Sequence, residues 1–152
     1  MQYHSIENFT TETGVICNDI ELSYEIFGEE LHTAPIVLVN HALTGNSDVA
    51  STHSGWWNGL VSKGNLIDTE RYTILSFNIP GNGYDKKPGN LIDNYKDFTA
   101  RDIARLFGRA LSEFGVQKLH TIIGGSLGGG IAWEMVVLFP ELATNLIAIA
   151  TD

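Results

Sequence analysis

One glycine-rich turn around a single serine constrains this chain more than any other feature: residues 124–129 read Gly-Gly-Ser-Leu-Gly-Gly. A short apolar run rich in β-branched residues, 119–123, precedes the turn, and apolar residues recur at helical spacing across 131–139. A sharp turn from a buried strand into a helix exposes a serine hydroxyl for nucleophilic attack. Such a turn strains the serine backbone, so the residues two positions before and after it must be small, and both are glycine here. The pattern therefore predicts Ser126 as a catalytic nucleophile.

Two other functions of glycine-rich turns do not fit this segment. A dinucleotide-binding turn requires glycine at the position of Ser126 and an acidic residue about 20 positions later, at the end of a second strand. Glu141 lies at a loosely suitable distance, but it follows Pro140 at the end of a helical pattern. A phosphate-binding loop requires Gly-Lys followed by serine or threonine, which the sequence lacks. A serine nucleophile remains the function that the turn supports.

Charge and cysteine content exclude several classes of function. The 152 residues suffice for one hydrophobic core, and the net charge of −9 argues against nucleic acid and anionic membrane surfaces as partners. The first ten residues contain no apolar segment typical of a secretion signal, and no apolar run approaches the roughly 20 residues of a membrane span. Cys17, the single cysteine, cannot form an internal disulfide, which favours a reducing, cytoplasmic compartment. No cluster of metal-ligating residues is evident, so we expect no metal.

Hydrophobic patterning predicts one α/β domain across residues 1–152. The helix expected at 99–114 has the clearest signal: Thr99 caps its first turn, Asp102 is the acidic capping partner, and Gly115 ends it. The alternation of strands and helices implies a mostly parallel sheet with helices on both faces. In chain order the sequence predicts two short strands within 14–27 around an Asn18-Asp19 turn, a strand at 36–39, a short helix at 55–61, a strand at 71–77, a long loop at 79–95, the 99–114 helix, a strand at 119–123, a helix at 131–139 and a strand at 146–150.

The expected site lies at one edge of this sheet. Ligands in such sheets bind beyond the carboxyl ends of the parallel strands. Loop 40–54, loop 79–95 and Ser126 each follow a predicted parallel strand. The three segments should therefore meet around one site.

Four segments resemble the α/β-hydrolase fold, and within it most closely the homoserine O-acetyltransferase family. Residues 40–45, Asn-His-Ala-Leu-Thr-Gly, resemble the family's loop after the third strand, and 55–61, Gly-Trp-Trp-Asn-Gly-Leu-Val, resemble its segment before the fourth strand. The Phe-Thr and Arg-Asp pairs within 98–102 resemble its helix entry, and 124–129 resembles its serine turn, with leucine where methionine is usual. The resemblance extends over about 36–150, and it implies the N-terminal portion of an α/β-hydrolase fold.

One loop departs from that family. Residues 78–89 read Asn-Ile-Pro-Gly-Asn-Gly-Tyr-Asp-Lys-Lys-Pro-Gly, where the family usually has Gly-Gly-Cys and Thr-Gly-Pro elements. The loop borders the expected site, so a paralogue with another substrate and an ester hydrolase both stay open as alternatives. Lys86 and Lys87 could meet a phosphate of CoA, but a charged loop tip explains them better.

The resemblance implies serine-based acyl transfer. Ser126 would attack the thioester of an acyl-CoA, form an acyl-enzyme and pass the acyl group to the hydroxyl of L-homoserine, a step of methionine biosynthesis. The backbone N–H groups of Leu127, after the nucleophile, and of Leu43, in the loop after the third strand, would form the oxyanion hole. We expect small-molecule substrates and no cofactor apart from acyl-CoA as co-substrate.

The general base that this serine requires is not evident in the sequence. Every histidine precedes Ser126, whereas this fold places the base and its acid near the C-terminus. We interpret His41, on the oxyanion loop, as shaping that loop by hydrogen bonding. The other histidines are His4, His32, His53 and His120. We interpret His120, within a buried strand, as structural, and His53 and Asp48 as solvated residues of a mobile loop. Trp56 and Trp57 are interpreted as packing residues, with a wall of the acyl pocket as the alternative for one of them.

A nucleophile without its base predicts an incomplete enzyme. We expect the chain to be the N-terminal portion of a larger enzyme, inactive alone, with an unpaired apolar edge on its last strand. The partner that fits this expectation is the missing C-terminal half or a second copy of the chain. A non-catalytic half that acts only in binding or assembly is the third alternative.

Overall fold

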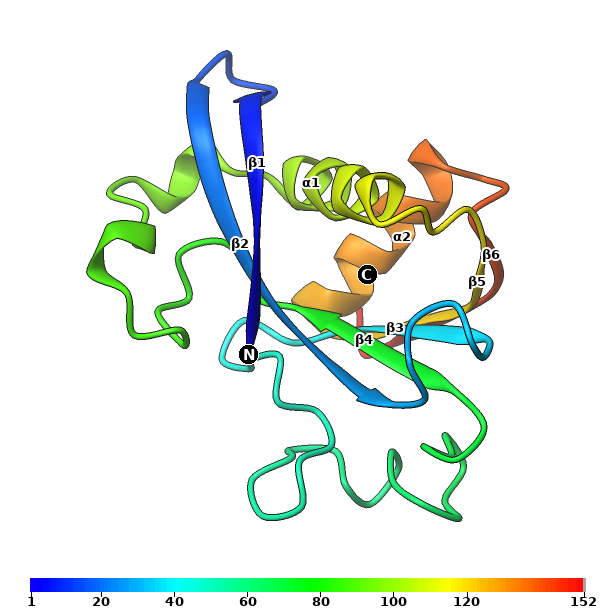
Figure 1. Ribbon diagram of the computed structural model, residues 1–152. Coiled ribbons are helices and arrows are strands. Elements are labelled where there is room, and N and C mark those ends of the chain that lie inside the picture. Colours follow the sequence, from blue (N-terminus) through cyan, green and yellow to red (C-terminus); the bar gives the residue numbers. More distant parts are fainter. Residues whose placement is uncertain (152) are drawn as a thin grey trace.

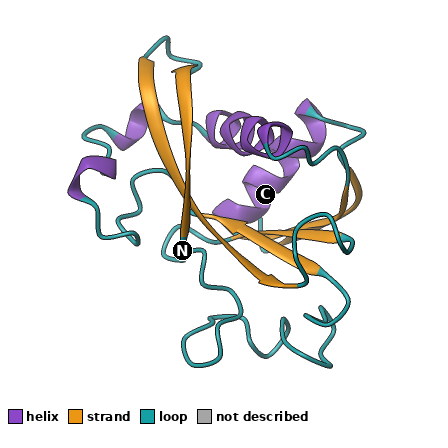
Figure 2. Cartoon of the chain, in the orientation of Figure 1, coloured by secondary structure: helices purple, strands orange, loops and turns teal. Residues whose placement is uncertain are grey.

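A six-stranded sheet organises the structure, a computed structural model that describes residues 1–151 (Figures 1 and 2). The strands lie in the order β1-β2-β4-β3-β5-β6; β1, β2 and β4 pair antiparallel, and β4, β3, β5 and β6 run parallel. This confirms the predicted mostly parallel α/β sheet. The elements are β1 Gln2–Thr10, β2 Ile16–Gly28, β3 Ile36–Asn40, β4 Thr73–Phe77, 3-10 turns at Pro88–Asn90 and Tyr95–Asp97, α1 Ala100–Glu113, β5 Leu119–Gly125, α2 Leu127–Leu138 and β6 Ala143–Ile149.

Two apolar layers cover opposite faces of this sheet. On one face, α1 and α2 pack over β3, β4 and β5 around Leu38, Leu75 and Ile122, which are fully buried (Figure 2). On the other face, segment 49–72 supplies Val49, Val61 and Ile67 to a second cluster. The prediction of helices on both faces is therefore not met among residues 1–151, where α1 and α2 lie on one face and turns cover the other. No helix among residues 1–151 is long and apolar enough to cross a bilayer.

The helix predicted at 55–61 is wrong, because the chain forms successive turns there. The N–H groups of Trp56 and Trp57 donate to the carbonyls of Asp48 and Val49 at 3.1 and 3.0 Å, so this segment is tied to the preceding loop. Glycines at both ends of the first turn also weaken a helix.

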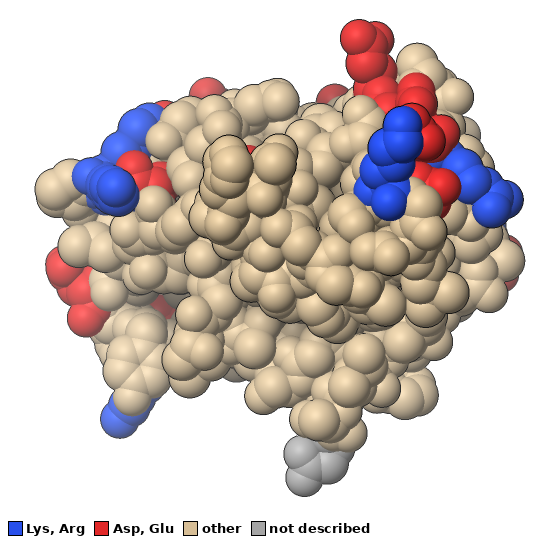
Figure 3. All heavy atoms as spheres, turned by 90° about the horizontal axis from the view of Figure 1, so that it is seen from below, with Lys and Arg blue, Asp and Glu red and all other residues tan. Residues whose placement is uncertain are grey.

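In Figure 3, which views the molecule from below, charged side chains gather near the margins and leave a broad uncharged area between them.

The N-terminal hairpin differs from the prediction. β2 continues through Asn18 and Asp19, and the turn lies instead between Thr11 and Val15, with Gly14 at a φ of +88°. Residues 2–10, which the sequence did not indicate as a strand, form β1. Asn8 adopts a φ of +54°, which interrupts the alternation of side chains and hides the strand pattern.

The central parallel strands carry the predicted apolar runs. All five residues of β3 and all five of β4 are buried. Val37 lies opposite both Ile74 of β4 and Thr121 of β5, so the three strands are in register. Their carboxyl ends therefore open at one edge of the sheet, where the loops after β3 and β4 and the turn after β5 begin.

Helix α1 begins with the predicted capping box. Thr99 Oγ1 accepts the Asp102 N–H at 3.1 Å, and Asp102 Oδ2 accepts the Thr99 N–H at 3.2 Å. Asp102 is fully buried, and its Oδ1 also accepts the Glu12 N–H at 2.9 Å and an Arg105 N–H at 3.1 Å. At the other end, Gly115 takes a φ of +74° and ends the helix as predicted. Asp102 thus joins the start of α1 to the β1–β2 turn.

Replacing Asp102 with alanine is expected to lower the free energy of unfolding by about 2–4 kcal/mol, because a helix cap is lost and buried donors lose their acceptor. Urea unfolding followed by circular dichroism measures the change. Asn94→Ala is the control, since Asn94 caps an exposed 3-10 turn; its change should stay within about 0.5 kcal/mol. Equal losses in the two variants would contradict the role of Asp102.

Candidate active site

Ser126 sits at the tip of the turn between β5 and α2. Its backbone has φ +52° and ψ −123°, a conformation that residues with a side chain rarely adopt. The Ser126 N–H donates to the carbonyl of Ile149 in β6 at 2.9 Å, and its own carbonyl accepts the N–H groups of Gly129 and Gly130. The Ser126 side chain is exposed and caps no backbone group of α2. The predicted strained turn is confirmed, and its hydroxyl is accessible.

Close backbone packing explains the two glycines that flank the serine. A Cβ atom on Gly128 would lie 2.2 Å from the carbonyl oxygen of Asn40 and 2.6 Å from that of His41. A Cβ atom on Gly124 would lie 2.2 Å from the carbonyl oxygen of Gly128. No side chain fits at either position, because the obstructing atoms are backbone. The start of α2 therefore rests directly on the end of β3 and brings the loop after β3 beside the nucleophile.

The two predicted oxyanion-hole residues lie on these adjoining segments. Leu127 is the first residue of α2, whose N-terminus favours negative charge. Leu43 lies in a tight turn, in which the Gly45 N–H donates to the carbonyl of Ala42 at 2.8 Å. The Leu43 side chain is 71% exposed, so only the backbone of this residue takes part in the turn. The assignment of the two N–H groups to an oxyanion hole stays a prediction.

His41 is a structural residue in this arrangement. Its side chain is 1% exposed; Nδ1 lies 2.7 Å from the carbonyl oxygen of Ala42, and Nε2 accepts the Ile79 N–H at 3.1 Å. Because one nitrogen donates and the other accepts, the ring is neutral and both nitrogens are occupied. His41 therefore shapes the loop after β3 by hydrogen bonding, as predicted, and also links it to the loop after β4. It has no free nitrogen with which to accept the Ser126 proton.

Burial lowers the pKa of His41 below its ordinary value of 6.5, although the hydrogen bond with Ala42 opposes this shift. As the pH falls below about 6.5, the unfolded chain binds a proton that the folded protein resists. Stability should thus be full above that pH and decrease as the pH falls toward the lower folded-state pKa. Urea unfolding of wild type and His41→Gln between pH 5 and 8 measures this; the variant should lose less stability on acidification. Parallel curves would contradict the prediction.

Two other residues considered in the sequence, Asp48 and His120, lie in surroundings different from those expected. Asp48 is buried, not solvated: burial raises the pKa of its carboxyl, but hydrogen bonds from Ser51 and Ser54 outweigh that effect and hold the pKa low. His53 is exposed, as expected. His120 lies in β5 as predicted, but its side chain is exposed and packs against the Tyr72 ring at 5.2 Å. No hydrogen bond joins a histidine to Ser126 among residues 1–151.

The tryptophans and Lys87 have structural contacts. Trp57 packs against the second apolar cluster, which confirms its packing role. Trp56 is exposed and stacks on Trp57, with the ring centroids 4.9 Å apart. Lys87 Nζ lies 2.7 Å from the Glu21 carboxylate and 3.5 Å from the centre of the Tyr3 ring. An ion pair with Glu21 thus occupies the ammonium group that could otherwise meet a phosphate.

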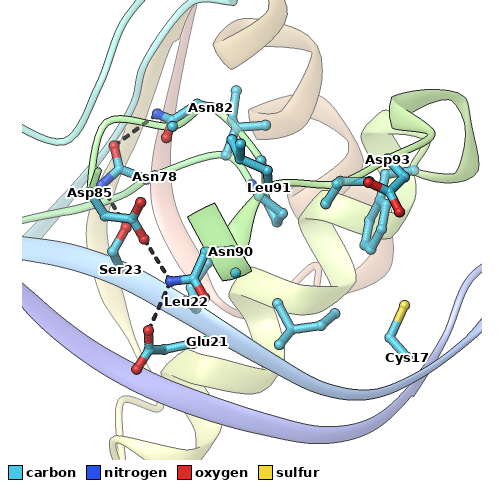
Figure 4. Close-up of a pocket in the computed structure, with 18 of the residues that line it drawn as sticks. Cys17, Glu21, Leu22, Ser23, Asn78, Asn82, Asp85, Asn90, Leu91 and Asp93 are labelled. Atoms are coloured by element: carbon cyan, nitrogen blue, oxygen red, sulfur yellow. Dashed lines mark hydrogen bonds between the residues drawn. The ribbon is translucent and has the colours of Figure 1, made fainter. Parts of the chain in front are cut away.

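A cavity of about 320 Å³ lies between β2 and loop 78–98 (Figure 4). Carboxylates such as Asp85 and Asp93 line it together with apolar side chains, and Ser126 is not among its lining residues. Cys17 also faces it; burial raises the pKa of this thiol, and the Asp97 and Asp102 carboxylates add to the shift. The thiol therefore stays protonated, in agreement with its assignment as an ordinary strand residue.

Comparison with known proteins places this geometry in a family. Residues 35–152 match the family described as alpha/beta hydrolase fold. The chain belongs to the alpha/beta hydrolase fold family. The strained serine after β5 and its flanking glycines lie within the matched residues. No group of three metal-ligating side chains forms among residues 1–151.

Individual relatives include transferases and a hydrolase. The chain is 33% identical to homoserine O-acetyltransferase of Geobacter sulfurreducens over 156 residues, which cover 92% of this chain and 42% of that protein. A crystal structure of homoserine O-acetyltransferase from Staphylococcus aureus superposes with a TM-score of 0.85 at 30% identity, covering 99% of this chain and 46% of the other. An acetylester hydrolase from Corynebacterium glutamicum superposes with a TM-score of 0.81 at 26% identity, covering 99% and 44%. The chain spans less than half the length of these relatives.

Proposed function

We propose that this α/β hydrolase provides the nucleophile for acyl transfer from an acyl-CoA to the hydroxyl of L-homoserine. The observation that carries the proposal is Ser126 itself: an exposed serine held at φ +52° by glycines that contact the end of β3. Similarity to homoserine O-acetyltransferases over 92% of the chain supports the choice of acceptor. The lone half-buried Cys17 supports a reducing, cytoplasmic setting for the reaction.

The proposed reaction has two halves. Ser126 Oγ attacks the thioester carbonyl carbon while a general base takes its proton. The backbone N–H groups of Leu43 and Leu127 stabilise the tetrahedral oxyanion, which collapses to the acyl-enzyme and releases CoA as the thiol. The homoserine hydroxyl then attacks the acyl-enzyme, loses its proton to the same base and leaves as the O-acyl ester, which restores Ser126.

In this proposal, the general base and its acid are supplied by residues other than 1–151. Support comes from His41, whose two nitrogens are already hydrogen-bonded, and from the absence of a histidine bonded to Ser126 in the described residues. The 152-residue chain alone should therefore turn over poorly. Robust acyl transfer by that chain would contradict this part of the proposal.

Ester hydrolysis is the second candidate function. Loop 78–89 departs in sequence from the transferase family, and it follows β4, whose carboxyl end lies at the same edge of the sheet as Ser126. The 26% identity to an acetylester hydrolase supports the same alternative. Water would then replace homoserine as the attacker of the acyl-enzyme.

Incubation with acetyl-CoA and L-homoserine separates the two functions, with O-acetylhomoserine, CoA and acetate measured by mass spectrometry. A transferase should release CoA and O-acetylhomoserine in equal amounts and depend on homoserine. A hydrolase should release acetate whether or not homoserine is present. Release of neither CoA nor either product, in the presence of the polypeptide that supplies the base, would refute both and favour a non-catalytic half.

A further inference from the structure

Asn78, the residue after β4, uses every hydrogen-bonding position of its side chain. Oδ1 accepts the Ser47 N–H at 2.8 Å and an Asn82 Nδ2–H at 3.0 Å, and Nδ2 donates to Ser23 Oγ and Ser47 Oγ, both at 2.9 Å. Figure 4 shows Asn78 between Ser23 and Asn82. The side chain is 2% exposed, so water does not compete for these bonds. One amide thus connects β2, the loop after β3 and the loop after β4.

The Ser47 hydroxyl has a fixed direction within this network. Ser47 Oγ donates to the Glu25 carboxylate at 2.5 Å and accepts from Asn78 Nδ2. Ser47 is fully buried. Because its N–H, its hydroxyl hydrogen and its lone pair all have partners, Ser47 is a fixed point of the loop after β3.

Two fixed points therefore enclose the predicted oxyanion-hole residue. His41 is bonded to the Ile79 N–H on one side of Leu43, and Ser47 is bonded to Asn78 on the other. The Leu43 side chain is 71% exposed and cannot hold the backbone by packing. The chain is therefore anchored on both sides of Leu43, and both anchors reach the segment just after β4.

We propose that Asn78 is a positioning residue of the active site, whose amide fixes residues 42–47 against the end of β4 and so orients the Leu43 N–H. This inference rests on the proposed function of Ser126 and Leu43. Oxyanion stabilisation requires donors that are already oriented before the charge develops. Asn78 supplies that orientation without touching substrate.

Amide hydrogen exchange tests the positioning directly in the protein as it stands. The informative proton is the Gly45 N–H, whose acceptor, the carbonyl of Ala42, is untouched by substitution at Asn78. In Asn78→Ala the Gly45 N–H should exchange about tenfold faster or more, whereas amides of β5 should change less than about twofold. Asn145→Ala is the matched control. Asn145 lies on β6, remote from loop 42–47, and its side-chain amide donates to the carbonyl of His120. Its replacement should leave the exchange rate of the Gly45 N–H unchanged. Unchanged Gly45 exchange in Asn78→Ala, or an equal increase everywhere, would overturn the proposal.

A milder variant keeps the test decisive if Asn78→Ala fails to fold. Ser47→Ala removes only the hydroxyl, so the Ser47 N–H still donates to Asn78. Gly45 exchange should then rise about threefold, again without a change in β5. No rise at Gly45 in this variant would count against the proposal.

Kinetics in the complete acyl-transferring protein provide a second measurement. Asn78→Ala should lower kcat about tenfold or more and leave KM within about twofold, because an oxyanion donor acts in the transition state. A higher KM with unchanged kcat would overturn the positioning role. If wild type transfers no acyl group, the proposed function fails, and Gly45 exchange still decides whether Asn78 positions the loop.

Discussion

In the complete acyl-transferring protein, Ser126→Ala is expected to lower kcat about 10⁴-fold or more, because the reaction loses the oxygen that forms the acyl-enzyme. Stability should change by less than about 0.5 kcal/mol, since the side chain is exposed and caps no backbone group. Steady-state kinetics and intact mass after incubation with acetyl-CoA measure the two effects. Wild type should gain one acetyl group, and the variant should gain none.

Ser112→Ala is the matched control for this experiment. Ser112 is an exposed serine on α1, away from the turn after β5, so its replacement should leave turnover and acetylation unchanged. Retention of the acetyl adduct in Ser126→Ala would place the nucleophile elsewhere. Retention of binding or assembly in Ser126→Ala, with no activity in wild type, would instead favour the non-catalytic alternative.

Gly128→Ala is expected to cause the largest loss of stability, more than about 3 kcal/mol, because the new methyl group cannot avoid fixed backbone. Its Cβ would lie 2.2 Å from the Asn40 carbonyl oxygen, and ordinary contact begins near 3.4 Å. Relief requires the start of α2 to move away from β3, which would also displace the nucleophile. The midpoint of thermal unfolding and the catalytic activity should therefore both decrease in this variant.

Gly130→Ala provides a control from the same helix. The nearest atom to a Cβ at Gly130 is Thr151 Oγ1 at 3.7 Å, an ordinary contact distance. Alanine favours the helical conformation over glycine by about 1 kcal/mol, so this variant should be as stable as wild type or more stable. Equal destabilisation of the two variants would show that the clash with β3 is not the cause.

The parts of the fold that follow simple periodicity were predictable from the sequence. Strands β3 to β5 are buried apolar runs, and α1 has an apolar stripe with a complete capping box, so local pattern and final structure agree. Strand β1 was missed because Asn8, in a left-handed conformation, interrupts the alternation. The turns at 55–61 were predicted as helix, since their bonds to the carbonyls of Asp48 and Val49 are tertiary contacts that no local pattern contains.

The site was predictable only where the motif itself carries the geometry. Ser126 and its glycines follow from the strained turn, and His41 follows from its position on the loop. The buried state of Asp48 and the hub formed by Asn78 join residues that are distant in sequence, such as Ser23 and Asn78. A polar residue directly after a buried strand was the one available signal for Asn78, and it does not specify partners.

The last strand also affects how the protein behaves at high concentration. β6 contains no charged residue, pairs with β5 alone among the described strands, and exposes Ile147 and Ile149 by 45% and 43%. Such an edge favours contact between copies, whereas a net charge of −9 keeps copies apart. Charge repulsion is screened within about 8 Å at physiological salt, but attraction between apolar edges is not. Colloidal stability should therefore be greatest in dilute buffer and decline as salt is added.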